Sequence, residues 1–318
     1  MASSTLPRAG PTVQLRLLDG GSFVAEEDKL HAGAPNNRFR MYDWAFHVHH
    51  PATDRHVLWD LGVEGDTQQD PDMYSTWVQK VIFGLVNPVG PRVPIDEQLS
   101  GQGVPAERVD AVVFRWGSPR HLWWLQCGWA DDAIVMHTGT IAGPSRRYFQ
   151  RQKGTLAPWD GRFFDPANAT ENWEELAGPW APFGPFEKAM DFFGDGSFYV
   201  IQAPGHMPGN LCAAARVQGG DWVLLGSDCC HSKKLLDGLC EFAVFDGPSG
   251  QKMCLQHDIP AAKDTLRRIK EFQSMGAHVA LAHDAEWMKE GSNQVLMALL
   301  GDDMKRAAVE RIPNDERP

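Results

Sequence analysis

Four polar side chains follow apolar segments of the chain, at the point where each segment ends. His206 follows Tyr-Val-Ile-Gln-Ala-Pro-Gly, Asp228 follows Val-Leu-Leu-Gly-Ser, and His283 follows His-Val-Ala-Leu-Ala. His121 follows the apolar residues 112–114 and a polar turn. In layered α/β folds such strand ends converge on one edge of a sheet. Three imidazoles and a carboxylate at one edge favour either a metal site or acid–base catalysis.

The elements that must position these residues follow from the spacing of apolar side chains. Alternating or compact apolar runs predict strands at residues 13–18, 44–49, 56–61, 109–114, 133–136, 197–202, 211–217, 222–225 and 278–282. Helical spacing predicts helices at residues 73–83, 95–101, 261–275 and 293–300. Early strands, inserted helices and then further strands and helices fit a layered α/β sandwich.

We expect one domain over residues 1–318, with two insertions. Residues 64–106 form a helical insertion. Residues 139–196 are rich in Pro, Gly and aromatic residues and have weak periodicity. A structureless loop of that length is improbable inside a compact domain, so this segment is predicted to be lid-like. Short aromatic clusters, which include Trp116 and Trp123, suit either a core or an apolar ligand cavity.

Composition excludes several classes of protein. The chain has 318 residues, of which 43% are hydrophobic and 22% are charged, as in a globular enzyme. The net charge of −11 argues against nucleic-acid binding. No apolar run approaches the roughly 20 residues of a membrane helix, and no secretory signal is evident. We therefore expect a cytoplasmic protein whose partner is a small-molecule substrate, with its six cysteines reduced. The oligomeric state is left open.

Five segments together resemble a known family. They are LWDLGV (58–63), FGDGSFYV (193–200), APGHMPGNL (203–211), LGSDCCH (225–231) and LAHD (281–284). In order and spacing they resemble the metallo-β-lactamase fold superfamily, and most closely its lactonase-like branch with its fungal homologues. The resemblance implies an αββα sandwich with a shallow site at one edge, which usually holds two zinc ions.

One family motif departs from its pattern. The signature His-x-His-x-Asp-His aligns with residues 116–121 of this chain. Trp116 and Ser118 stand at the first two histidine positions, Arg120 stands at the aspartate position, and only His121 is kept. The resemblance therefore leaves four implied ligands: His121, His206, Asp228 and His283.

These four residues do not suffice for two zinc ions. The first ion of the family would keep only His206 and Asp228, too few donors for a tight site. The second would keep His121, Asp228 and His283, a set that suits one metal. Arg120 opposes even that ion, because a unit charge pair at about 4 Å is worth about 4 kcal/mol at a dielectric of ~20. We expect no metal cofactor. One zinc, with His206 as a further ligand, is the alternative.

The expected function is acid–base chemistry on a small, apolar, carbonyl-bearing metabolite, such as a lactone, an ester or a polyketide-like compound. Hydrolysis, isomerisation, cyclisation and elimination all remain open. Arg120 would polarise the carbonyl, and Asp228 would orient a histidine or hold Arg120. The expected catalytic residues are Arg120, His121, His206, Asp228 and His283. The expected substrate-binding residues are Trp116, Ser118, Trp123 and His231, the last at a position where lactonase relatives often carry a tyrosine. The alternatives are a mononuclear zinc lactonase-like hydrolase and a non-catalytic small-molecule binding protein.

Two further groups of polar residues are interpreted as structural. His47, His49 and His50 alternate along a strand and precede a proline turn, which indicates a solvated face rather than a ligand set. Asp60 is followed by Gly62 and is expected to serve a turn and support the site indirectly.

Overall fold

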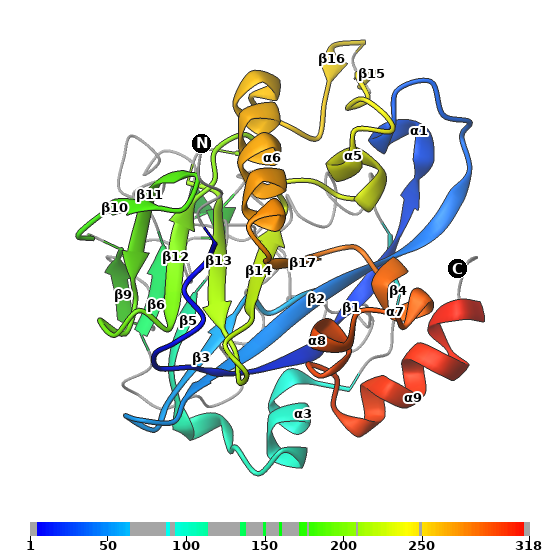
Figure 1. Ribbon diagram of the computed structural model, residues 1–318. Coiled ribbons are helices and arrows are strands. Elements are labelled where there is room, and N and C mark those ends of the chain that lie inside the picture. The colour runs from blue at the N-terminus through cyan, green and yellow to red at the C-terminus, as the bar shows by residue number, and fades with distance from the viewer. Residues whose placement is uncertain are drawn as a thin grey trace. The chain divides into compact units, whose positions relative to one another are not determined.

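The structure is a computed structural model (Figure 1). The chain divides into two compact units. Unit 1 comprises Met1–Leu15, Ala25–Arg40 and Ala177–Pro318, and unit 2 comprises Arg16–Val24 and Met41–Leu176. The residues that the structure describes are 5–63, 87–89, 93–113, 134–137, 149–150, 159–160, 172–176, 178–207, 209–247 and 250–314.

Unit 2 contains most of a seven-stranded mixed sheet. Across the sheet, its strands are β4 (Asn87–Val89), β1 (Gln14–Glu26), β2 (Arg38–His50), β3 (Arg55–Trp59), β5 (Val109–Val113), β6 (Ile134–His137) and β9 (Asn172–Glu175). β2 and β3 form an antiparallel hairpin, whereas β3, β5, β6 and β9 run parallel. The short helices α3 (Ile95–Gly101) and η2 (Ala106–Arg108) lead into β5.

Unit 1 contains a six-stranded sheet. Across the sheet, its strands are β10 (Ala181–Phe183), β11 (Phe186–Asp191), β12 (Phe198–Gln202), β13 (Leu211–Arg216), β14 (Trp222–Ser227) and β17 (His278–Leu281). Neighbouring strands are antiparallel except for β14 and β17, which are parallel. β13 and β14 are buried along their whole length, which explains their continuous apolar sequence.

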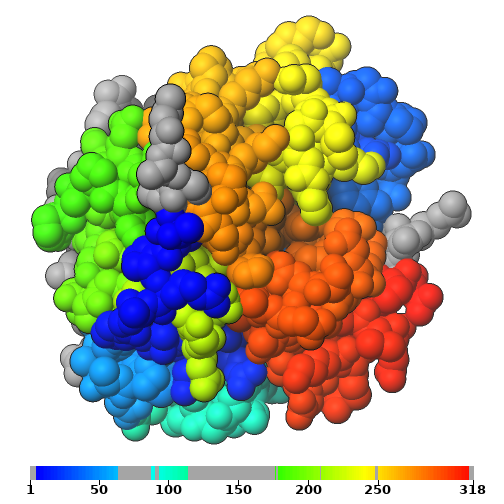
Figure 2. All heavy atoms as spheres, viewed as in Figure 1, coloured from blue at the N-terminus to red at the C-terminus, as the bar shows by residue number. Residues whose placement is uncertain are grey.

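Helix α6 (Ile259–Ser274) covers this sheet (Figure 1). Its buried side chains Leu266, Ile269 and Phe272 belong to one core cluster with residues of β11 to β14 and β17. The helix begins at Asp258, whose carboxylate accepts a hydrogen bond from the Ala261 N–H, as an N-cap does. The opposite side of α6 lies on the surface of the protein and is visible in Figure 2. The amphipathic pattern predicted for residues 261–275 is therefore confirmed.

The remaining described elements are short. They are α1 (Glu27–Leu30), β7 (Phe149–Gln150), β8 (Trp159–Asp160), α5 (Lys233–Asp237), β15 (Phe245–Asp246), β16 (Lys252–Met253), α7 (Glu286–Glu290), α8 (Gln294–Met297), α9 (Asp302–Glu310) and η6 (Ile312–Asn314). Within the described residues, no helix is long and apolar enough to cross a membrane. No disulfide joins the described cysteines, all of which are free thiols.

Most predicted elements are present, with shifted ends. The predicted helix at 73–83 lies outside the described residues. Strands β10 and β11 fall within the segment expected to be lid-like, and they pair with the six-stranded sheet. Helix α9 was not predicted, and the predicted helix at 293–300 is helical only over Gln294–Met297. The single-domain organisation with its two insertions stays a prediction.

The β2–β3 hairpin corrects one interpretation. His47 and His50 are buried, at 4% and 2% exposure, so they do not form the solvated face expected from the sequence. Burial, with the neighbouring His56 and His49, lowers the pKa of His47 to about 4. At the end of β3, the buried Asp60 has a positive φ of 65° and accepts a hydrogen bond from the Leu61 N–H, as a turn residue does.

Candidate active site

Three strands of the six-stranded sheet end at one edge and carry the polar residues of the site. β12 is antiparallel to β13, which is antiparallel to β14, so β12 and β14 run in the same direction. β17 runs parallel to β14. The carboxyl ends of β12, β14 and β17 therefore meet at one edge, and these strands are followed by His206, Asp228 and His283. Within unit 1, the structure therefore places these three residues at one edge of the sheet, as the sequence predicts.

The loop that carries His206 is held against the beginning of α6. The carbonyl oxygens of Gly205 and His206 accept hydrogen bonds from the N–H groups of Asp258 and His257. Gly205 has a φ of 138°, and a Cβ at this position would lie 2.4 Å from the Cα of Ala262. Glycine is therefore required here, because both the backbone conformation and the close approach of the helix exclude a side chain.

Asp228 follows a strained residue at the end of β14. Ser227 has a φ of 50°, in the left-handed region that non-glycine residues rarely adopt. Its carbonyl oxygen accepts a hydrogen bond from the N–H of Ala282, which immediately precedes His283. Backbone strain of this kind is concentrated at functional sites, where the surrounding structure holds it. The hydrogen bond between Ser227 and Ala282 joins the two loops that carry Asp228 and His283.

The side chains of these loops form a compact buried group. The Asp228 Oδ1 atom lies 2.6 Å from His283 Nε2 and 3.8 Å from His231 Nε2. The three side chains are only 2%, 6% and 8% exposed, respectively. The ring of His231 stacks on that of His283, with centroids 5.4 Å apart, and meets the ring of His206 edge-on at 5.1 Å. A buried carboxylate thus lies beside two imidazoles, and a third imidazole, that of His206, lies against the ring of His231.

His231 lies on the turn between β14 and α5. The next residue, Ser232, caps α5 by accepting a hydrogen bond from the Leu235 N–H, and its hydroxyl also contacts Nε2 of His31 at 2.8 Å. These contacts fix the backbone beside His231. The sequence predicts that His231 contacts the substrate, because its position in the family often carries a tyrosine, and this stays a prediction. The structure also places its imidazole beside Asp228, a contact for which the three-residue spacing from Asp228 is the available signal.

The group offers donors for one metal ion. Asp228, His231 and His283 each present a ligand atom, and these atoms all lie within 4.8 Å of one another. One carboxylate and two imidazoles are donors that zinc accepts. The contact of 2.6 Å between Asp228 and His283 is, however, the length of a charge-assisted hydrogen bond. Two ligand atoms of a tetrahedral zinc lie about 3.3 Å apart. The donors fit one ion only if metal ligation replaces this hydrogen bond.

The residues beside the group lie in an apolar setting. Burial raises the pKa of Asp284, which follows His283, to about 6. Burial also raises the pKa of the Cys230 thiol well above its ordinary value. Both side chains are buried, at 7% exposure for Asp284 and 0% for Cys230.

The structure describes only part of the predicted site. It brings together His206, Asp228, His231 and His283. The other predicted site residues lie outside the described residues, so the structure does not test the degenerate motif. They are Trp116, Ser118, Arg120, His121 and Trp123.

The chain is similar to several fungal proteins, whereas no protein-family model matches it. The chain is 29% identical to the metallo-hydrolase mfmC of Annulohypoxylon moriforme over 88% of this chain and 80% of that protein. It is 24% identical to the γ-lactamase FDB1 of Fusarium pseudograminearum over 71% of this chain and 55% of that protein. The cytochrome P450 monooxygenase mpaDE' of Penicillium brevicompactum is 25% identical over 88% of this chain, which spans only 34% of that protein.

Solved structures share the fold at low sequence identity. An N-acyl homoserine lactone hydrolase, with its product bound at the catalytic metal centre, matches with a TM-score of 0.63 and 14% identity. The match covers 89% of this chain and 97% of that one. A probable metal-dependent hydrolase from Staphylococcus aureus matches with a TM-score of 0.59 and 15% identity, over 87% of this chain and 91% of that one.

The α/β architecture with two large sheets is that of the metallo-β-lactamase-like sandwich, as expected from the sequence. The similarity to a metallo-hydrolase and to a γ-lactamase supports the resemblance to the metallo-β-lactamase fold superfamily and to its lactonase-like branch.

Proposed function

We propose that the protein is a hydrolase-like enzyme of specialised metabolism that acts on the carbonyl group of a small, apolar lactone, lactam or ester. The observation that carries this proposal is the hydrogen bond of 2.6 Å between the buried Asp228 carboxylate and the His283 imidazole. A carboxylate in this position orients an imidazole and stabilises the positive charge that the ring acquires when it takes up a proton.

The group supports general acid–base catalysis. His283 donates its Nε2 proton to Asp228 Oδ1, so the carboxylate holds that ring in one tautomer. His231 lies 3.8 Å from the same oxygen, and its protonated form is stabilised by the same charge. In hydrolysis, one of these imidazoles takes a proton from the attacking water and returns it to the leaving oxygen or nitrogen. Isomerisation, cyclisation and elimination beside a carbonyl would use the same two proton transfers.

Residues of the degenerate motif complete this proposal. Arg120 would stabilise the negative charge that develops on the carbonyl oxygen, as a fixed cation does. His121 would be a further acid–base group. Trp116, Ser118 and Trp123 would contact the substrate.

The names of the relatives support the substrate class. One relative is named a γ-lactamase, and one structural neighbour is named a lactone hydrolase. Cyclic esters and cyclic amides present the same reacting group, a carbonyl inside a ring. The fungal source of the relatives supports a role in specialised metabolism.

A single-zinc hydrolase is the second candidate. It is favoured by the three ligand atoms of Asp228, His231 and His283 within 4.8 Å of one another. His206 would be a further ligand, and the family resemblance implies His121 as another. A bound zinc would polarise the carbonyl and lower the pKa of a coordinated water.

Purified protein tested on a panel of lactones, lactams and esters distinguishes these candidates. We expect turnover by protein that contains less than about 0.1 equivalent of zinc by elemental analysis. His283→Ala should abolish that turnover, whereas the exposed His257→Ala serves as the control. About one equivalent of zinc, lost together with activity on treatment with EDTA and reduced in His231→Ala, would establish the second candidate. Ligand binding without turnover on any substrate of the panel would contradict both and indicate a binding protein.

A further inference from the structure

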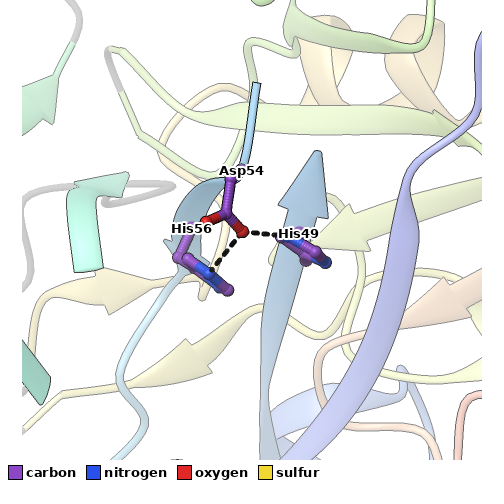
Figure 3. A group of neighbouring side chains, drawn as sticks. All are labelled: His49, Asp54 and His56. Atoms are coloured by element: carbon purple, nitrogen blue, oxygen red, sulfur yellow. Dashed lines mark hydrogen bonds and ion pairs between the residues drawn. The ribbon is translucent and has the colours of Figure 1, made fainter. Parts of the chain in front are cut away.

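A second group of ligand-type side chains lies in unit 2, on the β2–β3 hairpin. It consists of His49, Asp54 and His56, whose ligand atoms all lie within 4.8 Å of one another. Figure 3 shows both imidazole rings turned toward one carboxylate oxygen of Asp54. The proposed enzymatic function uses none of these residues.

The hairpin places the three side chains by its register. His49 on β2 and His56 on β3 are directly opposite each other in the antiparallel ladder. Opposite residues project to the same face of a sheet with their Cβ atoms about 5 Å apart. The two rings accordingly stack, with centroids 4.4 Å apart and planes inclined by only 8°. This stacking directs both rings toward the turn.

Asp54 is held over the pair by the geometry of the turn. It is the last residue of the four-residue connection between His50 and Arg55, and it has a φ of 54°. Asp is among the few residues that tolerate this left-handed conformation. Inside the turn, the His50 imidazole lies 2.6 Å from the Thr53 hydroxyl. The carboxylate is therefore positioned by a defined turn rather than by a flexible loop.

The distances between these atoms match those within a coordination sphere. Asp54 Oδ1 lies 3.0 Å from His49 Nε2 and 3.6 Å from His56 Nε2. Two ligand atoms of a tetrahedral zinc, each at about 2.0–2.1 Å from the ion, lie about 3.3 Å apart. The two observed distances bracket this value, so small movements of an exposed side chain would suffice to admit an ion.

The surroundings provide the support that metal-binding imidazoles usually have. The His56 Nδ1 atom lies 3.0 Å from Nε2 of the buried His47, which fixes the ring and leaves Nε2 directed at Asp54. Such contacts to the second ring nitrogen are typical of histidine ligands. On the other side, Arg108 binds Asp54 Oδ2 at 2.5 Å, and Asp110 accepts a hydrogen bond from the His56 N–H. Arg108 repels a cation, and the carboxylate of Asp110 partly offsets that repulsion.

We propose that the β2–β3 hairpin is a binding site for a divalent late transition metal ion, with His49, Asp54 and His56 as its protein ligands. Two imidazoles and one carboxylate suit zinc, nickel or copper, whereas calcium and magnesium prefer oxygen donors throughout. Asp54 is 65% exposed, so the ion remains in contact with water and exchanges with solvent. Such an ion would link the two strands of the hairpin and stabilise them by binding the folded state alone.

The test is a titration of chelator-treated, full-length protein with zinc, followed by calorimetry. We expect one binding event whose affinity falls at least tenfold in His49→Ala and in His56→Ala. The exposed His257 lies outside both groups, so His257→Ala is the matched control and should bind as the wild type does. His283→Ala removes a ligand from the group formed by Asp228, His231 and His283. Zinc binding at the hairpin should therefore remain in this variant.

A second measurement does not depend on variants. Carbethoxylation of histidines, followed by peptide mass spectrometry, reports the accessibility of each ring. Zinc should slow the modification of His49 at least threefold and leave that of His257 unchanged. Equal zinc affinity in all hairpin variants, or modification of His49 at the same rate with and without zinc, would overturn the proposal. Either result would leave the proposed enzymatic function unaffected.

Discussion

The described residues contain two groups of one carboxylate and two imidazoles, and these groups differ in burial and in spacing. Asp228 is 2% exposed and lies 2.6 Å from its nearer imidazole. Asp54 is 65% exposed, and its imidazoles lie 3.0 and 3.6 Å from it. The same three donor types are thus arranged as a tight hydrogen-bonded pair in one place and as an open set of ligands in the other.

Burial explains what each group can do. In an apolar setting a carboxylate interacts strongly with a nearby imidazole, so the Asp228 group is suited to moving protons. At the surface the same interaction is screened by water and salt, and an exposed ion pair contributes little to stability. The Asp54 group is therefore suited to reversible binding of an ion. The chemistry of such a group depends on its surroundings as much as on its residue types.

The largest effect is expected from removing the charge of the buried carboxylate. Asp228→Asn keeps the size of the side chain but no longer stabilises a protonated His283. We expect turnover to fall by about 100-fold to 10,000-fold, as on loss of an orienting carboxylate in other acid–base sites. The measurement is kcat/KM on the best substrate of the panel, with His257→Ala as the control. A loss of less than threefold would show that Asp228 does not take part in the reaction.

The second effect concerns the loop that holds His206. Gly205→Ala should destabilise the protein by about 2–4 kcal/mol, because its Cβ would meet the backbone of α6 in addition to the strain of a positive φ. Gly33 also has a positive φ, of 76°, but nothing lies within 4 Å of its would-be Cβ. Gly33→Ala is therefore the matched control, and we expect it to cost about 1 kcal/mol.

Urea unfolding of the two glycine variants measures the difference. Equal losses would mean that strain alone, rather than contact with α6, requires glycine at position 205. This pair of variants tests whether the loop that carries His206 owes its position to packing against α6.

The sequence predicted the buried group better than the exposed one, for a physical reason. His206, Asp228 and His283 follow apolar strands, and apolar runs are visible in a sequence because burial requires them. Parallel strands then bring their carboxyl ends to one edge. The sequence predicts that His231 belongs to the pocket, but it does not predict the contact with Asp228. The position of the His231 side chain depends on how a turn packs, and no periodicity of apolar residues reveals that.

The solvated face expected at His47 and His50 was wrong for the opposite reason. Alternation of His47 and His49 along a strand suggested a solvated face, but period-two spacing does not reveal which face is covered. The register that pairs His49 with His56, and the left-handed turn at Asp54, depend on the length of the connection and on contacts between strands. Neither is encoded in a short motif.

A smaller effect is expected from removing the exposed carboxylate. Asp54→Asn removes the ion pair with Arg108, whose side chain is 53% exposed, and keeps a residue that tolerates the left-handed turn. We expect no measurable change in the midpoint of urea unfolding at 0.15 M salt without metal, because exposed pairs are screened and flexible. A clear loss of stability in this variant would contradict the distinction between a buried carboxylate that interacts strongly with its neighbours and an exposed one whose interactions are screened by solvent.

A pH-dependent effect is expected at His31, which supports the turn beside His231 through Ser232. Burial, and then the positive charge of Lys234, lower the pKa of His31, while Glu27 acts in the opposite direction. The folded state therefore disfavours protonation, and the unfolded chain takes up the proton more readily. The contribution of His31 to the free energy of unfolding is greatest above about pH 6.5, and it decreases as the pH falls below that value. His31→Gln lacks this titration, so its difference from the wild type in urea unfolding should be smaller at pH 5.5 than at pH 7.5. A constant difference across this range would show that His31 keeps the same affinity for protons in the folded and unfolded states.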